Sequence, residues 1–380
     1  MTHVFIVDQN TFKYHLEYMF AGTGAGTSTG KNETIFLQDS TVGPYHAIER
    51  KLAAMICDIS RVKKSDKIIF YVQGLGKFYG VFEAASSPFY DTEADNYLDA
   101  ELKKTLTFRV KIKPHQVYAE GITEHECLDS LQGITHPYEM CWSLIYRKLK
   151  GNRGCTMITD YEFEKLLFKL KAKNRSTPLS GTGFTYNHSS KKIEPSSITN
   201  SYTGDELSLD IKKRMLYKAN RKNAFEVHLQ AYILQNLTKE PLKELLCFNQ
   251  NNVWVGNEVA CGVGMQRIDI MTIYQDEKNV YIKIVELKCI KPHSSLIDEQ
   301  ISWYVQWVCD YIAPNFNKNK AVHIIPTVLA QKEDSISSTD FYTKAKAFSY
   351  PRSIPNVIIE PVEYIGFTIS GSDIDFEPIF

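Results

Sequence analysis

Residues 258–288 decide the fold of this chain and read EVACGVGMQRIDIMTIYQDEKNVYIKIVELK. Two β-rich runs flank a polar turn at residues 275–279, which is a hairpin signal. Residues 280–288 alternate with a period of two, so Glu286 and Lys288 point to the same face of their strand. Asp269 lies near the middle of the first strand. Pairing of the two strands is therefore expected to bring two carboxylates and a lysine together at one end of a sheet.

Two close carboxylates with a lysine beside them have a definite chemical use. The repulsion between the carboxylates is best relieved by a divalent cation. Mg²⁺ prefers hard oxygen ligands and keeps several waters, so a site with two carboxylates suits it. Such a cation activates water near neutral pH, and Lys288 would orient that water or neutralise charge developing on a phosphoryl group. The alternative is a surface hairpin with ordinary charges, because 23% of the residues are charged.

The runs RIDI at 267–270 and IVELK at 284–288 resemble the PD-(D/E)xK nuclease superfamily, in particular its NucS-like nuclease domain. In that family an Asp, a Glu and a Lys carry the chemistry, and the resemblance gives these roles to Asp269, Glu286 and Lys288. It implies that Asp269 and Glu286 bind Mg²⁺, for which Mn²⁺ can substitute. It also implies an α/β core with a mixed sheet flanked by helices. The resemblance covers roughly residues 205–330 and lacks the Pro that often precedes the Asp.

Two further segments resemble helices of the same family. The run DEQISWY at 298–304 looks like the helix that bears a Gln with a Tyr four residues on, which are Gln300 and Tyr304 here. The run FEVHLQAYI at 225–233 looks like the opening helix with an inward Glu, which is Glu226. The resemblance therefore adds Gln300 and Glu226 to the candidate catalytic residues.

Length and composition set broad limits on the chain. With 380 residues two domains are expected, and 43% hydrophobic residues are ordinary for a soluble protein. Lys and Arg balance Asp and Glu at 44 each, so nucleic-acid binding must come from local basic clusters. None of the eight cysteines has Cys-x-x-Cys spacing, which gives no support to zinc ribbons or redox motifs. Without a signal peptide or a membrane-length apolar run, we expect a cytoplasmic protein away from membranes.

The N-terminal part predicts a small β-barrel with helices. Strands are expected at 4–7, 67–72, 78–83 and 109–113, with helices at 11–20 and 45–62. The run IFYVQGLGKFYGVFE at 69–83 resembles the hairpin of YTH- and EVE-type PUA-like domains, in which it walls a pocket for a modified or flipped base. The resemblance implies a base-reading domain over residues 1–120. Because residues 1–141 contain no Trp, such a pocket needs other aromatic residues, and the alternative is that these rings form the barrel core. The candidates are Tyr45, Tyr71, Phe78 and Tyr79.

Residues 121–204 predict a basic helical segment followed by a linker. Helices are expected at 137–149 and 161–170, and residues 175–204 lack apolar periodicity. Basic residues exceed acidic ones from 147 to 175, and a second basic cluster opens the following domain. Both clusters suit a phosphate backbone, and a solvated face is the alternative. The candidate DNA-binding residues are Lys169, Lys171, Lys173, Lys212, Lys213 and Arg214.

The whole chain therefore predicts an α+β protein in which a nuclease domain at 205–380 follows the base-reading domain. Its later elements are a helix at 296–311 and strands at 321–329 and 357–367. We expect a Mg²⁺-dependent endonuclease of restriction type that acts on double-stranded DNA, with sites selected by the N-terminal domain through a flipped or modified base. Cutting both strands needs two active sites, which predicts a homodimer. The alternatives are a NucS-like repair or mismatch nuclease on branched or single-stranded DNA, and a non-catalytic reader of modified nucleic acid.

Overall fold

The chain forms two compact units of mixed α and β structure in the computed structural model. The structure describes residues 1–24, 34–42, 46–91, 106–128, 133–145, 154–197, 200–246, 252–262, 266–316 and 318–380. The N-terminal unit comprises Met1–Ile134 and Cys141–Asp210, and the C-terminal unit comprises Thr135–Met140 and Ile211–Phe380. None of the helices in the described ranges combines the length and the apolar character needed to cross a bilayer.

The N-terminal unit is built on an eight-stranded sheet with the strand order β2-β6-β4-β3-β1-β8, to which β5 and β7 add at β6 and β4. A separate hairpin pairs β9 with β10. The strands are β1 (Thr2–Val7), β2 (Phe20–Thr23), β3 (Lys67–Val72), β4 (Lys77–Ala84), β5 (Phe89–Tyr90), β6 (Phe108–Pro114), β7 (Ile122–Thr123), β8 (Cys155–Ile158), β9 (Phe184–Asn187) and β10 (Lys192–Pro195). The predicted hairpin of β3 and β4 is present, and both strands are buried along nearly their whole length.

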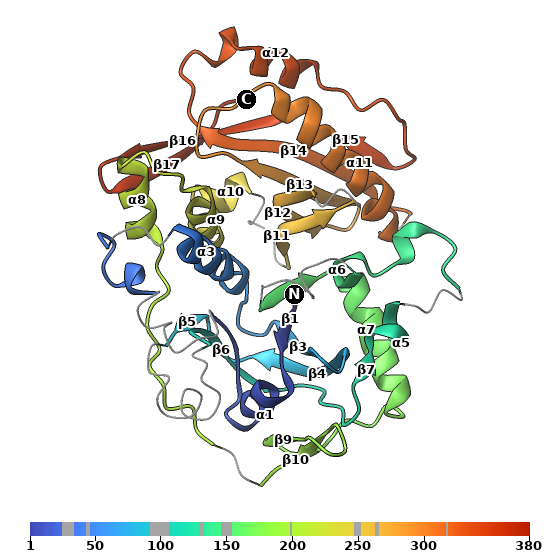
Figure 1. The fold of residues 1–380 in the computed structure, drawn as a ribbon. Helices are drawn as coiled ribbons and strands as arrows, with labels where there is room; N and C mark the ends of the chain where they lie inside the picture. The colour runs from blue at the N-terminus through green and yellow to red at the C-terminus, as the bar shows by residue number, and fades with distance from the viewer. Residues whose placement is uncertain are drawn as a thin grey trace. The chain divides into compact units, whose positions relative to one another are not determined.

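The helices of this unit pack on the sheet through their apolar faces. They are α1 (Gln9–Glu17), α3 (His46–Ser60), α5 (Glu124–Leu128), α6 (Trp142–Ile145) and α7 (Asp160–Lys173), with a 3₁₀ turn η1 (Ile35–Leu37). A capping box begins α7, in which Thr159 and Glu162 each accept from the other's backbone N–H. Leu166 and Leu170 of α7 are fully buried in one core cluster, and α7 runs beside α5 and β7 (Figure 1).

Three predictions between residues 121 and 204 are wrong. The expected helix at 137–149 is broken, because Met140 has an extended backbone between a 3₁₀ turn at Pro137–Glu139 and α6. Cys155–Ile158 is an edge strand paired with β1 rather than part of a helical region. The expected linker at 175–204 contains the β9–β10 hairpin, in which Phe184, Tyr186 and Ile193 are buried. Nonlocal pairing and burial stabilise these short strands, and local periodicity does not reveal them.

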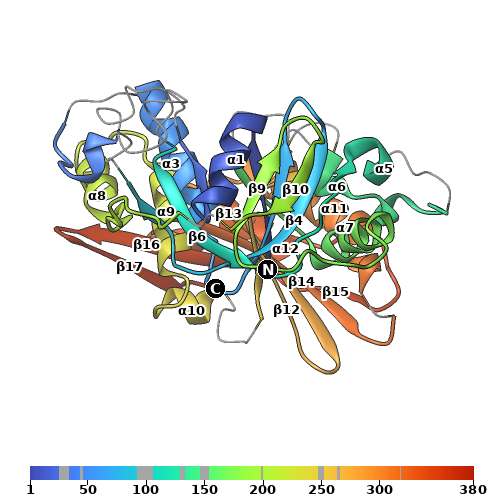
Figure 2. The same ribbon diagram turned by 90° about the horizontal axis from the view of Figure 1, so that it is seen from below.

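The C-terminal unit contains a seven-stranded mixed sheet with the order β11-β12-β13-β14-β16-β17, and β15 pairs with β14. Strands β11 to β13 are antiparallel neighbours, whereas β14 is parallel to both β13 and β16. The strands are β11 (Trp254–Cys261), β12 (Gln266–Gln275), β13 (Asn279–Leu287), β14 (Ala321–Gln331), β15 (Val357–Ile359), β16 (Glu363–Ser370) and β17 (Asp373–Pro378). Figure 2 shows β16 and β17 side by side as two long strands, which pair antiparallel.

Helices accompany this sheet and carry several of the predicted site residues. They are α8 (Lys212–Asn220), α9 (Glu226–Asn236), α10 (Leu242–Leu245), α11 (Ser302–Tyr311) and α12 (Asp340–Ala347), with shorter turns η3 (Pro137–Glu139), η5 (Ala313–Asn315) and η6 (Ile336–Ser338). A π-helical segment, η4 (Leu296–Ile301), leads directly into α11. Because β13 and β14 are parallel, the chain must cross over between them, and η4 and α11 form that crossover.

Candidate active site

The β12–β13 hairpin brings Asp269 and Glu286 to adjacent strands. The two strands pair antiparallel with Ile270 opposite Val285, so the next position along the pair places Asp269 across from Glu286. Asp269 Oδ2 accepts a hydrogen bond of 2.7 Å from the backbone N–H of Leu287, just beyond Glu286. The pairing of β12 with β13 ends at this point, which leaves backbone groups of β13 available to the side chain. The structure therefore brings the predicted pair of carboxylates together.

Glu286 lies at the centre of a hydrogen-bonded cluster. Its side chain is 2% exposed, and its Oε1 atom accepts from the ammonium group of Lys288. Its Oε2 atom lies 3.1 Å from the hydroxyl of Tyr304 on α11, which also lies 2.8 Å from the carbonyl oxygen of Arg267. Since the phenol has a single proton, these two acceptors share it. Tyr304 thus fixes the carboxylate of Glu286 from the crossover helix.

Burial and mutual repulsion set the protonation of the cluster. Burial raises the pKa of Asp269 well above its usual range, and the negative charge of Glu286 raises it further. Burial also raises the pKa of Glu286, although Lys288 and Tyr304 oppose this shift. Burial lowers the pKa of Lys288, but the surrounding carboxylates outweigh it and the net pKa is raised. The cluster therefore has an excess of negative charge that a cation would relieve.

Glu226 and Glu258 extend this negative region. Glu226 is the first residue of α9, and its charge raises the pKa of both Glu286 and Lys288. Glu258 lies on β11 across from Asp269, between the paired positions Asn257 and Val259, and has a left-handed backbone with φ of 49°. Its carboxylate holds Arg267 at 2.8 Å, and its charge raises the pKa of Asp269. Glu258 was not predicted, because its role depends on register across the sheet and has no local sequence signal.

A second residue of α9 supports Asp269 from behind. Gln230 is 3% exposed, and its Nε2 donates a 2.7 Å hydrogen bond to the backbone oxygen of Asp269. In contrast, Gln300 lies half-exposed on η4, and no contact described for it reaches Asp269 or Glu286. Of the two helical side chains predicted on the 298–304 segment, the structure thus brings Tyr304 into the cluster.

The donor set fits a hard divalent cation, although within the described residues no group of three or more His, Cys, Asp or Glu side chains gathers as a metal site. Mg²⁺ is usually held by one or two protein carboxylates, with water and substrate phosphate completing its coordination. Asp269 and Glu286 supply two such carboxylates. Burial raises the pKa of both carboxyls, and the negative charges of Glu286 and Glu226 raise those of Asp269 and Glu286 further, a repulsion that a cation relieves.

The predicted DNA-binding residues differ from one another in their exposure and in their partners. Lys169, Lys171 and Lys173, the α7 lysines, are all half-exposed, but Lys173 is held by both carboxylate oxygens of Glu126 at 2.7 and 2.9 Å. Lys212 pairs with Asp373 at 3.0 Å, and Lys213 is exposed. Arg214 is only 2% exposed and lies over the ring of Tyr217, so its burial gives no support to the predicted phosphate contact.

The predicted base-pocket aromatics are buried. Tyr71, Phe78 and Tyr79 are at most 4% exposed, and Tyr71 and Phe78 belong to one core cluster. The hydroxyl of Tyr71 donates to Glu124 at 2.7 Å, and that of Tyr79 donates to the backbone oxygen of Lys191 at 2.9 Å. This burial gives no support to a base pocket at the β3–β4 hairpin. The fourth candidate, Tyr45, lies outside the described residues.

Comparison with known proteins gives no family assignment. No protein-family model and no curated protein sequence matches the chain. Among solved structures, a hypothetical protein from Leishmania major and a protein from Pseudomonas putida are each 13% identical to it, with a TM-score of 0.26. Both matches cover 45% of this chain, and they span 95% and 99% of those proteins respectively. The chain is thus similar to two solved structures over less than half its length, at a level that assigns neither fold family nor activity.

Proposed function

We propose that the C-terminal unit is a metal-dependent nuclease of the PD-(D/E)xK type, acting on double-stranded DNA. The observation that carries this proposal is the convergence of Asp269, Glu286 and Lys288 at the end of two paired strands, within one hydrogen-bonded cluster. A mixed sheet flanked by helices also agrees with the fold that the sequence resemblance implies.

Each residue of the cluster has a separate role in this proposal. Asp269 and Glu286 would hold Mg²⁺, or Mn²⁺ in its place, and the cation supplies Lewis-acid stabilisation and an activated water when bound. The backbone N–H of Leu287 orients Asp269, and Tyr304 orients Glu286. Lys288 keeps its proton beside Glu286 and is placed to neutralise charge on a phosphate that enters the site.

The proposal also includes site selection by the N-terminal unit, a homodimer and a cytoplasmic location. The N-terminal unit would be a PUA-like domain that selects the site, although the burial of Tyr71, Phe78 and Tyr79 points away from the β3–β4 hairpin as the reading surface. Cleavage of both strands would require a homodimer, because each chain supplies one such cluster. A cytoplasmic location would give this enzyme access to DNA.

Cleavage of genomic DNAs that differ in methylation tests the proposal. The purified full chain with Mg²⁺ is expected to cut at least one of them, and Asp269→Asn is expected to cut none. Cleavage confined to mismatched, branched or single-stranded DNA would favour a repair nuclease. Binding without cleavage under any divalent metal would instead favour a non-catalytic reader.

A further inference from the structure

The C-terminal unit contains a pocket of about 580 Å³ that is lined by two residues adjacent in the chain to members of the candidate active site. The lining residue Phe225 directly precedes Glu226, and the lining residue Cys289 directly follows Lys288. Its volume falls within the range of about 300–1,000 Å³ that is usual for small-molecule sites. A ligand bound in this pocket would therefore lie next to the reacting centre.

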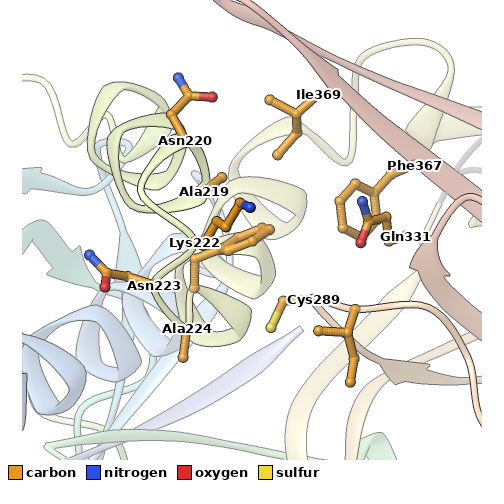
Figure 3. A pocket seen from close by; sticks show the side chains of 11 residues that line it. Ala219, Asn220, Lys222, Asn223, Ala224, Cys289, Gln331, Phe367 and Ile369 are labelled. Atoms are coloured by element: carbon orange, nitrogen blue, oxygen red, sulfur yellow. The ribbon is translucent and has the colours of Figure 1, made fainter.

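The walls of the pocket combine an apolar floor with polar groups at the rim. Phe225 and Phe367 are both buried, with ring centroids 6.2 Å apart, and form the aromatic floor of the pocket. Figure 3 shows Asn220 and Lys222 on one side of the pocket and Gln331 on the other, next to Phe367. Among the lining residues that the structure describes, Lys222 is the only charged one.

Three polar side chains at the rim have no hydrogen-bonding partner among the residues that the structure describes. The side chains of Asn220, Lys222 and Gln331 are exposed, and in the described structure no hydrogen bond or ion pair to the protein engages them. Two of the amides that line the pocket and its one ammonium are therefore available to bind a ligand. Amides can pair with the donors and acceptors on a base edge, and a lysine can neutralise a phosphate.

Lys222 occupies a backbone position that usually favours glycine. The N–H of Asn223 bonds to the oxygen of Lys218 at 3.0 Å, and the N–H of Lys222 bonds to the oxygen of Ala219 at 2.9 Å. These two bonds form the Schellman motif that ends α8, with Lys222 at the left-handed position and φ of 56°. A side chain in this conformation is strained, so a lysine here carries a cost that glycine would avoid.

We infer that this pocket binds one unstacked nucleotide of the substrate strand, beside the phosphate that is to be cleaved; the inference rests on the proposed nuclease function. The base would occupy the space that Phe225 and Phe367 line, with its edge toward the amides of Asn220 and Gln331. Lys222 would contact a phosphate of the same nucleotide. The aromatic floor, the unpaired amides and the lysine as sole charge each match one part of a nucleotide.

Binding of a fluorescent oligonucleotide to the full chain tests this inference. The probe is a single-stranded oligonucleotide with one 2-aminopurine, whose fluorescence rises when the base leaves its stack, measured in EDTA so that no cleavage occurs. Lys222→Gly is expected to weaken binding of the probe about tenfold. It should also reduce the slope of log affinity against log salt concentration by about 1, which corresponds to the loss of one phosphate contact. Gln331→Ala is expected to reduce the fluorescence rise. Neither variant should lower the melting temperature, and Lys222→Gly should raise it.

Two matched controls separate the pocket from general effects. Lys191→Gly makes the same substitution at another left-handed lysine, with φ of 55°, in the N-terminal unit. Thr368→Ala changes β16 between Phe367 and Ile369, on the face that points away from the pocket. Both controls are expected to bind the probe like the parent protein.

The outcomes distinguish this inference from the proposed function. If the parent protein cuts DNA while Lys222→Gly binds the probe normally with an unchanged KM, the pocket inference is wrong and the nuclease proposal stands. If the parent binds the probe and Lys222→Gly does not, but neither cuts, the pocket binds nucleotides and the catalytic proposal fails. If the parent neither binds nor cuts, both are overturned.

Discussion

Replacing Tyr304 with Phe tests whether the crossover helix holds Glu286 in its ionised form. The substitution removes one hydroxyl, which lies 3.1 Å from Glu286 Oε2 and 2.8 Å from the oxygen of Arg267. A hydrogen bond to a charged group contributes about 1.5–3 kcal/mol, and sharing of the proton places the expected loss of unfolding free energy at about 1–2 kcal/mol at pH 8. Urea unfolding followed by tryptophan fluorescence measures this loss, since Trp254, Trp303 and Trp307 all lie in the C-terminal unit.

The loss should depend on pH in a defined direction. The folded pKa of Glu286 is already raised, so ionisation of Glu286 makes the folded state less stable as pH rises above the unfolded value. The Tyr304 hydroxyl opposes this shift, so without it stability falls more steeply with pH and the acid limb of cleavage moves to higher pH. The loss is thus expected to be small at pH 4 and largest at pH 8. Tyr342→Phe on α12 is the matched control, and an equal loss at both pH values would refute the reasoning.

Three further substitutions examine the site and its surroundings. Asp269→Asn should abolish cleavage, yet in metal-free buffer it should raise the melting temperature above that of the parent by more at pH 8 than at pH 5, because a carboxylate with a raised folded pKa destabilises the fold as pH rises; equal melting shifts at both pH values would argue against the raised pKa of Asp269. Lys288→Ala should abolish cleavage while gel-shift affinity stays within about a few-fold of the parent value; an active variant would place the catalytic centre elsewhere. Reversal of the three α7 lysines to Glu should weaken binding to all DNA sequences alike, with a shallower salt dependence; undiminished affinity would identify α7 as a solvated face.

The β12–β13 hairpin could be predicted because its signals are local. The alternation at 280–288 and the polar turn before it fix which residues share a face, and this determined the positions of Glu286 and Lys288. The helix at 137–149 was mispredicted for the opposite reason. Its apolar spacing is helical, yet Met140 is extended and belongs to a different unit from Trp142. Local periodicity does not indicate where a chain passes from one unit to another.

The residues that complete the site depend on pairing between distant strands. Glu258 faces Asp269 only because β11 pairs with β12 in one register, with Asn257 opposite Ile270. Gln230 contacts the backbone of Asp269 from the middle of α9, where its sequence context is that of an ordinary buried helix. Strand β8 is likewise identified only by its partner β1. Such contacts follow from the tertiary fold and leave little trace in a single sequence.

The path of the chain between the two units affects how readily recombination can exchange one unit between genes. Thr135–Met140 belongs to the C-terminal unit although the segments on both sides belong to the N-terminal unit, so the chain passes between units after Ile134, Met140 and Asp210. A domain joined by one connection can be exchanged by a single recombination event. Here a break at residue 210 would transfer the C-terminal unit without the turn at Pro137–Glu139 that is part of it. The two units should therefore be exchanged between genes less readily than two domains arranged end to end.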